Sequence, residues 1–314
     1  MKQGWFGNAY GGYGSKDRYE GNAMVNRFVN NDQITFMGGT NNTNNMGFSD
    51  LASTMFSGMG GGGGRRGGFG AGSGITSSGN AGLNFSKEFK PDKLTLGGNT
   101  RYSHSDNDAR SKSDRQNILP GDSSSYDNSE AMSRTKSDNF GVDFRLEWKP
   151  DTMTQLIFRP SFSLSHSMND NFSDATTLDN ERDTVNTNKS SNYSESNGYN
   201  LNASIDFSRK LNNKGRVFSA TLSGGNSDSY SDGMNRSDIV YFNQTDALKN
   251  SIIDQRSRYD NKGFNYRAYV SWVEPIGHNN FIQATYSISQ RKQEALKNVY
   301  NQDADGIYLS LIHI

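Results

Sequence analysis

The residues that could carry out chemistry in this chain form no recognisable catalytic set. The sequence contains no cysteine, so it offers no thiolate nucleophile, zinc–cysteine site or disulfide framework. Serine and aspartate are so frequent that no Ser–His–Asp combination stands out. The four histidines, His104, His166, His278 and His313, lack the spacing of metal ligands. His104 and His166 lie near predicted strand ends, where a solvated polar residue is favoured over a ligand. We therefore predict no enzyme activity, no metal site and no cofactor.

Some shorter motifs resemble binding loops but are incomplete. The glycine-rich run Gly58–Gly68 lacks the Gly-Lys-Ser/Thr ending of a phosphate loop, and its single Arg-Gly-Gly unit favours an external loop over an RNA-binding segment. Residues 301–306 are similar to the start of a calcium loop, but the twelfth position is Ile312, which has no carboxylate. The acidic segments 105–114 and 168–183 could bind a divalent cation weakly, although solvated loops are the default interpretation.

The composition excludes several classes of protein. The 314 residues carry 33 basic and 33 acidic side chains, so the zero net charge gives no electrostatic case for nucleic acid. Mean hydropathy is −0.84, and Phe, Leu, Ile and Val make up about 18% of the chain, which is little for an ordinary globular core. Aromatic residues reach 11%, which argues against wholesale disorder. No apolar run is long enough for a membrane-spanning helix, and the polar first 30 residues contain no signal-peptide core.

Apolar and polar residues alternate along the chain, which is the period of a β-strand. In residues 263–274, for example, the even positions are Phe264, Tyr266, Ala268, Val270 and Trp272, and the odd positions between them are polar residues or tyrosine. No segment has a helical period, so the predicted fold class is all-β. The pattern predicts eleven strands, at 4–14, 17–29, 32–43, 79–89, 92–105, 140–148, 156–164, 199–207, 218–223, 263–274 and 282–288.

Short and long connections alternate between the predicted strands. The short ones contain Pro, Asn, Asp or Gly, as tight hairpins require. The long ones are polar and cover 44–77, 107–136, 168–195 and 231–260, and only the short link 14–17 breaks the alternation. This connectivity predicts an antiparallel up-and-down transmembrane β-barrel, with short periplasmic turns and long extracellular loops. Several strands exceed the 9–11 residues that span a bilayer, so we expect them to continue past the lipid on the long-loop side.

Each strand is therefore predicted to meet lipid on its apolar face and a wet lumen on its polar face. Predicted lipid-facing or girdle residues are Phe140, Phe144, Trp148, Phe158, Phe162, Phe207, Tyr266, Trp272 and Tyr286. Aromatic residues near the short turns, including Phe28, Phe89 and Phe281, favour an interfacial girdle over the general enrichment of aromatics in strands. Predicted lumen-facing residues are Arg101, Asp143, Arg145, Arg159, Asp206 and Arg267, for which cross-strand pairing and plug contact are favoured over ligand contact.

The segments GWFGNAYGGYGSKDRYEGNAMVNRF and NNDQITFMGGTNNTNNMGFSD resemble the first barrel strands of TonB-dependent-receptor-type outer-membrane proteins. The glycine-rich stretch 58–74 and the Asn/Asp/Ser-rich loops fit the same family, and the likeness covers nearly the whole chain. Plugged transporters of this kind have about 22 strands, so residues 1–308 are predicted to form the N-terminal half of a barrel. Residues 309–314 fit no strand phase and are predicted to mark a truncation or a non-native end.

The resemblance implies a bacterial outer-membrane receptor for the energy-coupled uptake of a nutrient, such as a chelated metal, a glycan or a peptide. Its implied partners are outer-membrane lipid, a plug domain and an inner-membrane energy-coupling complex, with no nucleic acid. The alternatives are a structural or adhesive outer-membrane barrel without a transport cycle, and a secreted soluble β-protein.

Overall fold

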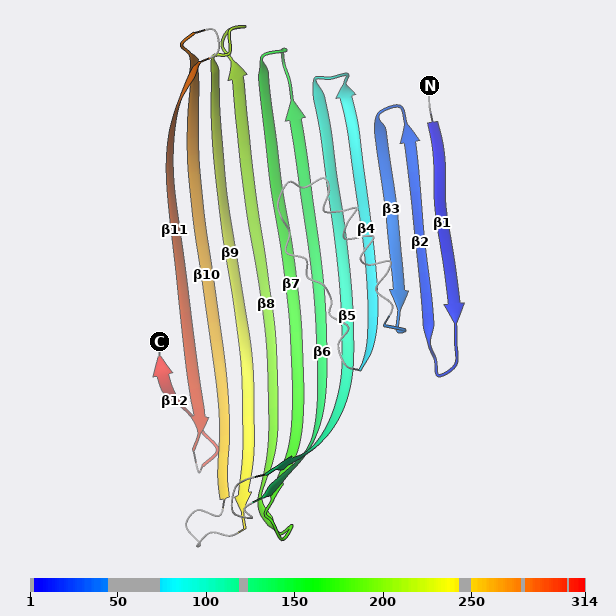
Figure 1. The fold of residues 1–314 in the computed structure, drawn as a ribbon, viewed down its shortest axis with the longest axis vertical. Coiled ribbons are helices and arrows are strands. Elements are labelled where there is room, and N and C mark those ends of the chain that lie inside the picture. The colour runs from blue at the N-terminus through cyan, green and yellow to red at the C-terminus, as the bar shows by residue number, and fades with distance from the viewer. Residues whose placement is uncertain are drawn as a thin grey trace.

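The computed structural model describes residues 3–44, 74–118, 124–242, 250–277, 280–303 and 305–313, without the side chains of 311–313. These residues form one antiparallel sheet whose strands follow one another in sequence order, and the sheet is open, with β1 and β12 at its edges (Figure 1). In this part of the chain, no helix is long and apolar enough to cross a membrane. The strands are β1 (Gln3–Tyr13), β2 (Tyr19–Val29), β3 (Asp32–Asn41), β4 (Ile75–Lys90), β5 (Leu94–Asn117), β6 (Ser125–Trp148), β7 (Thr154–Leu178), β8 (Thr184–Lys210), β9 (Val217–Tyr241), β10 (Asn250–Pro275), β11 (Phe281–Gln302) and β12 (Tyr308–His313).

The all-β, up-and-down architecture predicted from the sequence is confirmed, but the count of eleven strands is wrong because of β12. Residues 309–313 were expected to fit no strand phase, yet Tyr308–His313 pairs with Asn298–Gln302 of β11. The register shifts between Val299 and Tyr300, and such a bulge interrupts the alternation on which the sequence prediction depended. That residues 309–314 are a non-native end stays a prediction.

The predicted long loops are largely strand. Segments 107–136, 168–195 and 231–260 extend β5 to β10 to lengths of 24 to 27 residues. The ladder between β5 and β6 is unbroken from Leu94 paired with Trp148 to Asn117 paired with Ser125. These extensions are polar on both faces and give no hydropathy signal, but antiparallel pairing still satisfies their backbone groups. The expectation that strands exceed 9–11 residues is therefore confirmed, and that they continue past a bilayer stays a prediction. Most of 44–77 and of 58–74 lies outside the described residues.

The predicted short turns lie together at one end of the sheet (Figure 1). The hairpins β2–β3, β4–β5, β6–β7, β8–β9 and β10–β11 all meet there. Asn30 and Asp92 adopt φ of 55°, and Gly215 adopts φ of 101°, which are conformations that Asn, Asp and Gly tolerate. In the β6–β7 turn, Asp151 Oδ1 accepts a 2.8 Å hydrogen bond from the Met153 amide. Local turn chemistry thus sets which ends of the strands are joined.

Strand register gathers the apolar residues on one face beside these turns. On this face the apolar band covers Leu94–Tyr102 of β5, Phe140–Trp148 of β6, Leu156–Leu164 of β7 and Tyr199–Phe207 of β8, and we call it the belt. Phe85 of β4 and Phe144 of β6 pack 6.4 Å apart across Gly98, where an added Cβ would lie 2.7 Å from the Phe144 ring. The glycine is therefore needed for these rings to meet.

Candidate functional site: the two faces of the sheet

The belt is an apolar surface that the sheet does not cover. Among the described residues, the only hydrophobic side chains classed as buried are Met37 and Ala109. By contrast, Leu201 in the belt is 47% exposed, and Leu222, which continues the same face on β9, is 55% exposed. Soluble monomers rarely expose contiguous apolar patches above a few hundred Å², and this one crosses many strands. Each belt segment on β5 to β8 is nine residues long, which matches the roughly 9–11 residues of a strand that crosses a bilayer.

All nine predicted lipid-facing residues share the belt face. The strand registers place all of them on one side of the sheet. They are Phe140, Phe144 and Trp148 of β6, Phe158 and Phe162 of β7, Phe207 of β8, Tyr266 and Trp272 of β10, and Tyr286 of β11. Near the turns, the rings of Phe207, Phe218 and Trp272 form a chain with centroid separations of 6.2 and 6.3 Å. That these residues contact lipid stays a prediction.

Two of the expected girdle aromatics lie on the opposite face. Phe28 pairs in register with Gln33, and its ring stacks on Phe6 at 5.4 Å. Phe281 pairs with Pro275, one residue out of phase with the belt. Nearness to a turn does not determine the face of a side chain, because a shift of one residue reverses it. The girdle interpretation therefore does not hold for Phe28 and Phe281, whereas Trp148 and Phe207 share the belt face.

The six predicted lumen residues all lie on the face opposite the belt. Arg101 Nη1 lies 2.8 Å from Asp143 Oδ2 across β5 and β6, and Arg159 pairs with Asp206 across β7 and β8. Arg145 instead contacts Glu147 of its own strand at 3.2 Å, and Arg267 pairs in register with Ser223 and Ser289. Cross-strand pairing is thus present in two of the expected places, while contact with a lumen or a plug stays a prediction.

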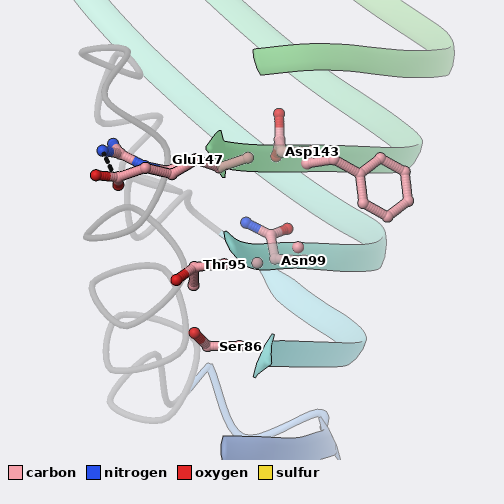
Figure 2. A pocket seen from close by; sticks show the side chains of 9 residues that line it. Ser86, Thr95, Asn99, Asp143 and Glu147 are labelled. Carbon is pink, nitrogen blue, oxygen red and sulfur yellow. Dashed lines mark hydrogen bonds and ion pairs between the residues drawn. The ribbon is translucent and has the colours of Figure 1, made fainter. Parts of the chain in front are cut away.

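A small hollow occupies this polar face near the turns (Figure 2). Ser86, Thr95, Asn99, Asp143 and Glu147 line it, and its volume is about 110 Å³. Ligand pockets usually enclose about 300–1,000 Å³, so the hollow suits a few water molecules or one polar group. Sequence reasoning missed Glu147, whose carboxylate also contacts Lys149 at 2.7 Å and Gln155 at 2.8 Å. Its two-residue spacing from Arg145 and Asp143 was the signal that could have found it.

Beyond the belt, the two faces differ in charge over residues 103–112 of β5, 130–139 of β6, 165–174 of β7, 189–198 of β8 and 229–238 of β9, which we call the distal half. On the face opposite the belt, no residue is ionisable, and we call it the serine–asparagine face. Its residues are Ser103, Ser105, Asn107, Ala109, Ser111, Ala131, Ser133, Thr135, Ser137, Asn139, Ser165, Ser167, Asn169, Asn171, Ser173, Ser190, Asn192, Ser194, Ser196, Gly198, Ser229, Ser231, Gly233, Asn235 and Ser237.

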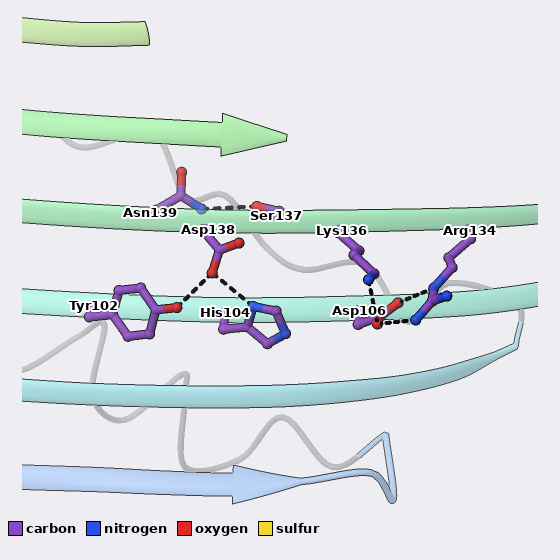
Figure 3. A network of polar contacts seen from close by, with 8 residues as sticks. All are labelled: Tyr102, His104, Asp106, Arg134, Lys136, Ser137, Asp138 and Asn139. Atoms are coloured by element: carbon purple, nitrogen blue, oxygen red, sulfur yellow. Dashed lines mark hydrogen bonds and ion pairs between the residues drawn. The ribbon is translucent and has the colours of Figure 1, made fainter. Parts of the chain in front are cut away.

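The other distal face continues from the belt away from the short turns and is mostly ionisable, and we call it the charged face. Its residues are His104, Asp106, Asp108, Arg110, Lys112, Glu130, Met132, Arg134, Lys136, Asp138, His166, Met168, Asp170, Phe172, Asp174, Lys189, Ser191, Tyr193, Glu195, Asn197, Tyr230, Asp232, Met234, Arg236 and Asp238. Asp106 lies 2.7 Å from Arg134 and 3.8 Å from Lys136 (Figure 3). The hydrogen bonds from Arg134 hold the pKa of the Asp106 carboxyl below its usual value.

The described residues contain no cluster of three or more His, Asp or Glu side chains that could hold a metal ion. His104 and His166 were expected near strand ends but lie within β5 and β7, where each contacts a neighbouring strand. In the candidate calcium loop, Asp303 Oδ1 accepts the amides of Asp305 at 3.0 Å and Ile307 at 2.8 Å, which makes it a turn residue. His278 and the side chain of His313 lie outside the described residues.

Comparison with known proteins gives little further identification. No family model matches the chain, and no curated protein matches it. Among solved structures, the toluene transporter TodX of Pseudomonas putida is 8% identical, with 93% of this chain and 87% of that chain covered and a TM-score of 0.22. A likeness at this TM-score supports no conclusion about this chain.

Proposed function

We propose that this chain forms part of the wall of a bacterial outer-membrane β-barrel. The observation that carries the proposal is the belt, which is exposed, apolar and nine residues high on each of four adjacent strands. Hydrocarbon is the solvent in which such a surface is stable, and a closed barrel is the only sheet that satisfies its backbone groups there. The open edges at β1 and β12 would pair with further strands in the complete barrel.

We further propose that the barrel takes up a nutrient ligand by energy-coupled transport, without chemical catalysis. The face opposite the belt supports this role, because it carries ion pairs near the turns and the neutral serine–asparagine face farther from the turns. Both suit a water-filled lumen. The TonB-dependent-receptor resemblance adds a plug domain and an inner-membrane energy-coupling complex as partners. Ligand capture at the outer end would then be followed by plug movement.

A structural or adhesive barrel is the second candidate, and the length of the strands favours it. At about 3.3 Å per residue, a strand of 24 to 27 residues is roughly 80 Å long. The hydrocarbon core is about 30 Å thick, so a large part of β5 to β10 would project from the membrane. Such a projecting surface could serve attachment without any transport cycle.

Spin labelling tests the membrane assignment directly, because the chain has no cysteine and each variant carries one label. Leu201→Cys and Ile205→Cys probe the belt, and Asn202→Cys and Ser204→Cys probe the opposite face of the same strand at matched depth. In outer membranes of cells that produce the protein, we expect oxygen to relax the first pair and a water-soluble nickel chelate the second. Equal accessibility on both faces would contradict the proposal.

Uptake by whole cells separates the two functional candidates. Cells with and without the protein would receive a radioactive ferric chelate, a labelled neutral oligosaccharide and a labelled peptide, each with and without a protonophore. Energy-coupled transport predicts that one probe accumulates only when the protein is present and the membrane is energised. Unchanged uptake of all three, with weaker surface attachment in the deletion strain, would favour the adhesive barrel.

A further inference from the structure

A groove lies on the belt face at the level where the belt ends. Its volume is about 510 Å³, and two adjacent rows of side chains from β5 to β9 line it. The row nearer the turns, which is the last row of the belt, includes Phe140, Leu164 and Tyr199. The row farther from the turns, which is the first row of the charged face, includes Asp138, His166 and Asn197. The wall of the groove nearer the turns is therefore apolar except for Asp228, and the wall farther from the turns is polar.

Hydrogen bonds between neighbouring strands hold the polar groups of this groove in place. Tyr102 donates to Asp138 Oδ1 at 2.6 Å, and His104 Nδ1 lies 2.8 Å from the same oxygen (Figure 3). His166 Nδ1 lies 2.8 Å from Asn197 Oδ1. The carboxylate, the imidazole and the amide each have further donor or acceptor positions besides these bonds. A polar ligand in the groove would thus meet preorganised groups rather than mobile side chains.

The charge of the groove discriminates between kinds of polar ligand. Two carboxylates line it, Asp138 and Asp228, and Lys262 Nζ lies 3.8 Å from the second. Carboxylates disfavour a phosphate group in the same site, because like charges repel. Carboxylate, amide and imidazole groups pair well with hydroxyl groups, and the rings of Tyr199 and Tyr230 offer flat apolar surfaces with a polar tip. This combination suits an uncharged, hydroxyl-rich ligand.

The position of the groove indicates where that ligand comes from. The belt on β5 runs from Leu94 at the turns to Tyr102 at the groove, about 27 Å along the strand, so the groove lies at the opposite interface of a bilayer from the turns. Tyrosines are typical of this level. On the premise of the proposed function, that the belt meets lipid, we propose that the groove binds the sugar headgroup of an outer-leaflet glycolipid, whose acyl chains lie against the belt.

Lipid analysis of the protein purified from outer membranes in mild detergent tests this site. Native mass spectrometry of the wild-type protein should show a bound lipid, and its fragmentation should release a sugar. Tyr199→Ala combined with Asn197→Ala should carry roughly tenfold less of that lipid, because a tenfold loss corresponds to one or two lost contacts. Tyr193→Ala is the matched control, because Tyr193 lies on the same strand and face, two rows farther from the turns than Asn197 and Tyr230. This variant should retain the lipid.

A milder variant guards against loss of folding. Tyr199→Phe removes the hydroxyl, which donates to Asn226 at 3.0 Å, but keeps the ring, and it should retain most of the lipid. Equal lipid in the wild type and the double variant, or a bound lipid without sugar, would overturn the proposal. Displacement of the lipid by a free disaccharide at low millimolar concentration would assign the groove to soluble sugars instead. If the chain were absent from the membrane fraction altogether, the proposed function would fail first, and the two failures are therefore distinguishable.

Discussion

The serine–asparagine face and the charged face are the two sides of the same segments of β5 to β9, yet their side chains differ in chemical type. Both faces are polar, so their hydropathy does not distinguish them. On the charged face, ion pairs cross between strands, as in Lys189 with Asp174 at 3.7 Å and Lys112 with Glu130 at 3.0 Å. On the serine–asparagine face the contacts are neutral, as in Ser196 with Ser231 at 2.8 Å.

The difference shows how strands that are polar on both sides can keep one register. Small neutral side chains would accept a shift along the strand with little change in contacts, and such strands are prone to slippage. Charges between β5 and β6 restrict that freedom, because the native register sets Asp106 opposite Lys136 and Asp108 opposite Arg134, whereas a two-residue slip in one direction would set Asp106 opposite Asp138. We infer that the charged face and the turns specify pairing in the distal half, which leaves the serine–asparagine face free of that task.

The largest expected effect comes from a charge placed in the belt. Leu201→Arg should lower the free energy of unfolding in lipid by about 2 kcal/mol, because an arginine on the lipid face costs about 2–4 kcal/mol at the bilayer midplane and less toward the interface. Asn202→Arg, the next residue and on the opposite face, should change it by less than about 0.5 kcal/mol. Denaturant titration of both variants in vesicles would measure this, and equal losses would mean that the belt does not contact lipid.

A charge reversal on the charged face should have an intermediate effect. Asp106→Arg places like charges beside Lys136, its partner in register, and beside Arg134. We expect a loss of about 1 kcal/mol, the upper end for directly opposed like charges in a sheet. Combining it with Lys136→Asp restores an opposite pair in register, so the double variant should recover part of the loss in a double-mutant cycle. Additive losses in that cycle would show that the pair does not support the register.

How much of this could be predicted from sequence depends on the contrast between the two sides of a strand. The belt was predictable because Phe158 and Phe162 alternate with Arg159 and Ser161, which is a strong period-two signal. In the distal half both sides of each strand are polar, so hydropathy alone predicts loops there. A weaker signal was present, since Asp106, Asp108 and Arg110 alternate in charge with neutral residues. The groove was not predictable, because it joins residues of five strands whose relative register only the structure provides.

The pH dependence of the charged face is a smaller effect with a definite sign. Because Arg134 lowers the pKa of Asp106 in the folded state, the ionised carboxylate stabilises the fold at all pH values above the unfolded pKa, near 3.8. That stabilisation is lost as pH falls below 3.8 and through the lower folded pKa. The stability difference between the wild type and Asp106→Asn should therefore be constant from pH 7 to pH 5 and shrink toward pH 3. A difference that grew in acid would reverse the assigned role of Arg134.

The smallest effect is expected from the serine–asparagine face. Ser196→Ala removes the hydrogen bond to Ser231 but leaves every ion pair in place, so the loss should be about 0.5 kcal/mol, and the register should not change. Cysteines at Asn171 and Asn192, which pair in register, provide the measurement, because oxidative cross-linking reports their alignment in a chain without other cysteines. Cross-linking should be equal with and without Ser196→Ala, and weaker when Asp174→Lys disrupts the pair with Lys189. If the serine variant lost cross-linking as well, the neutral face would share in specifying the register, and the division of labour inferred between the two faces would be wrong.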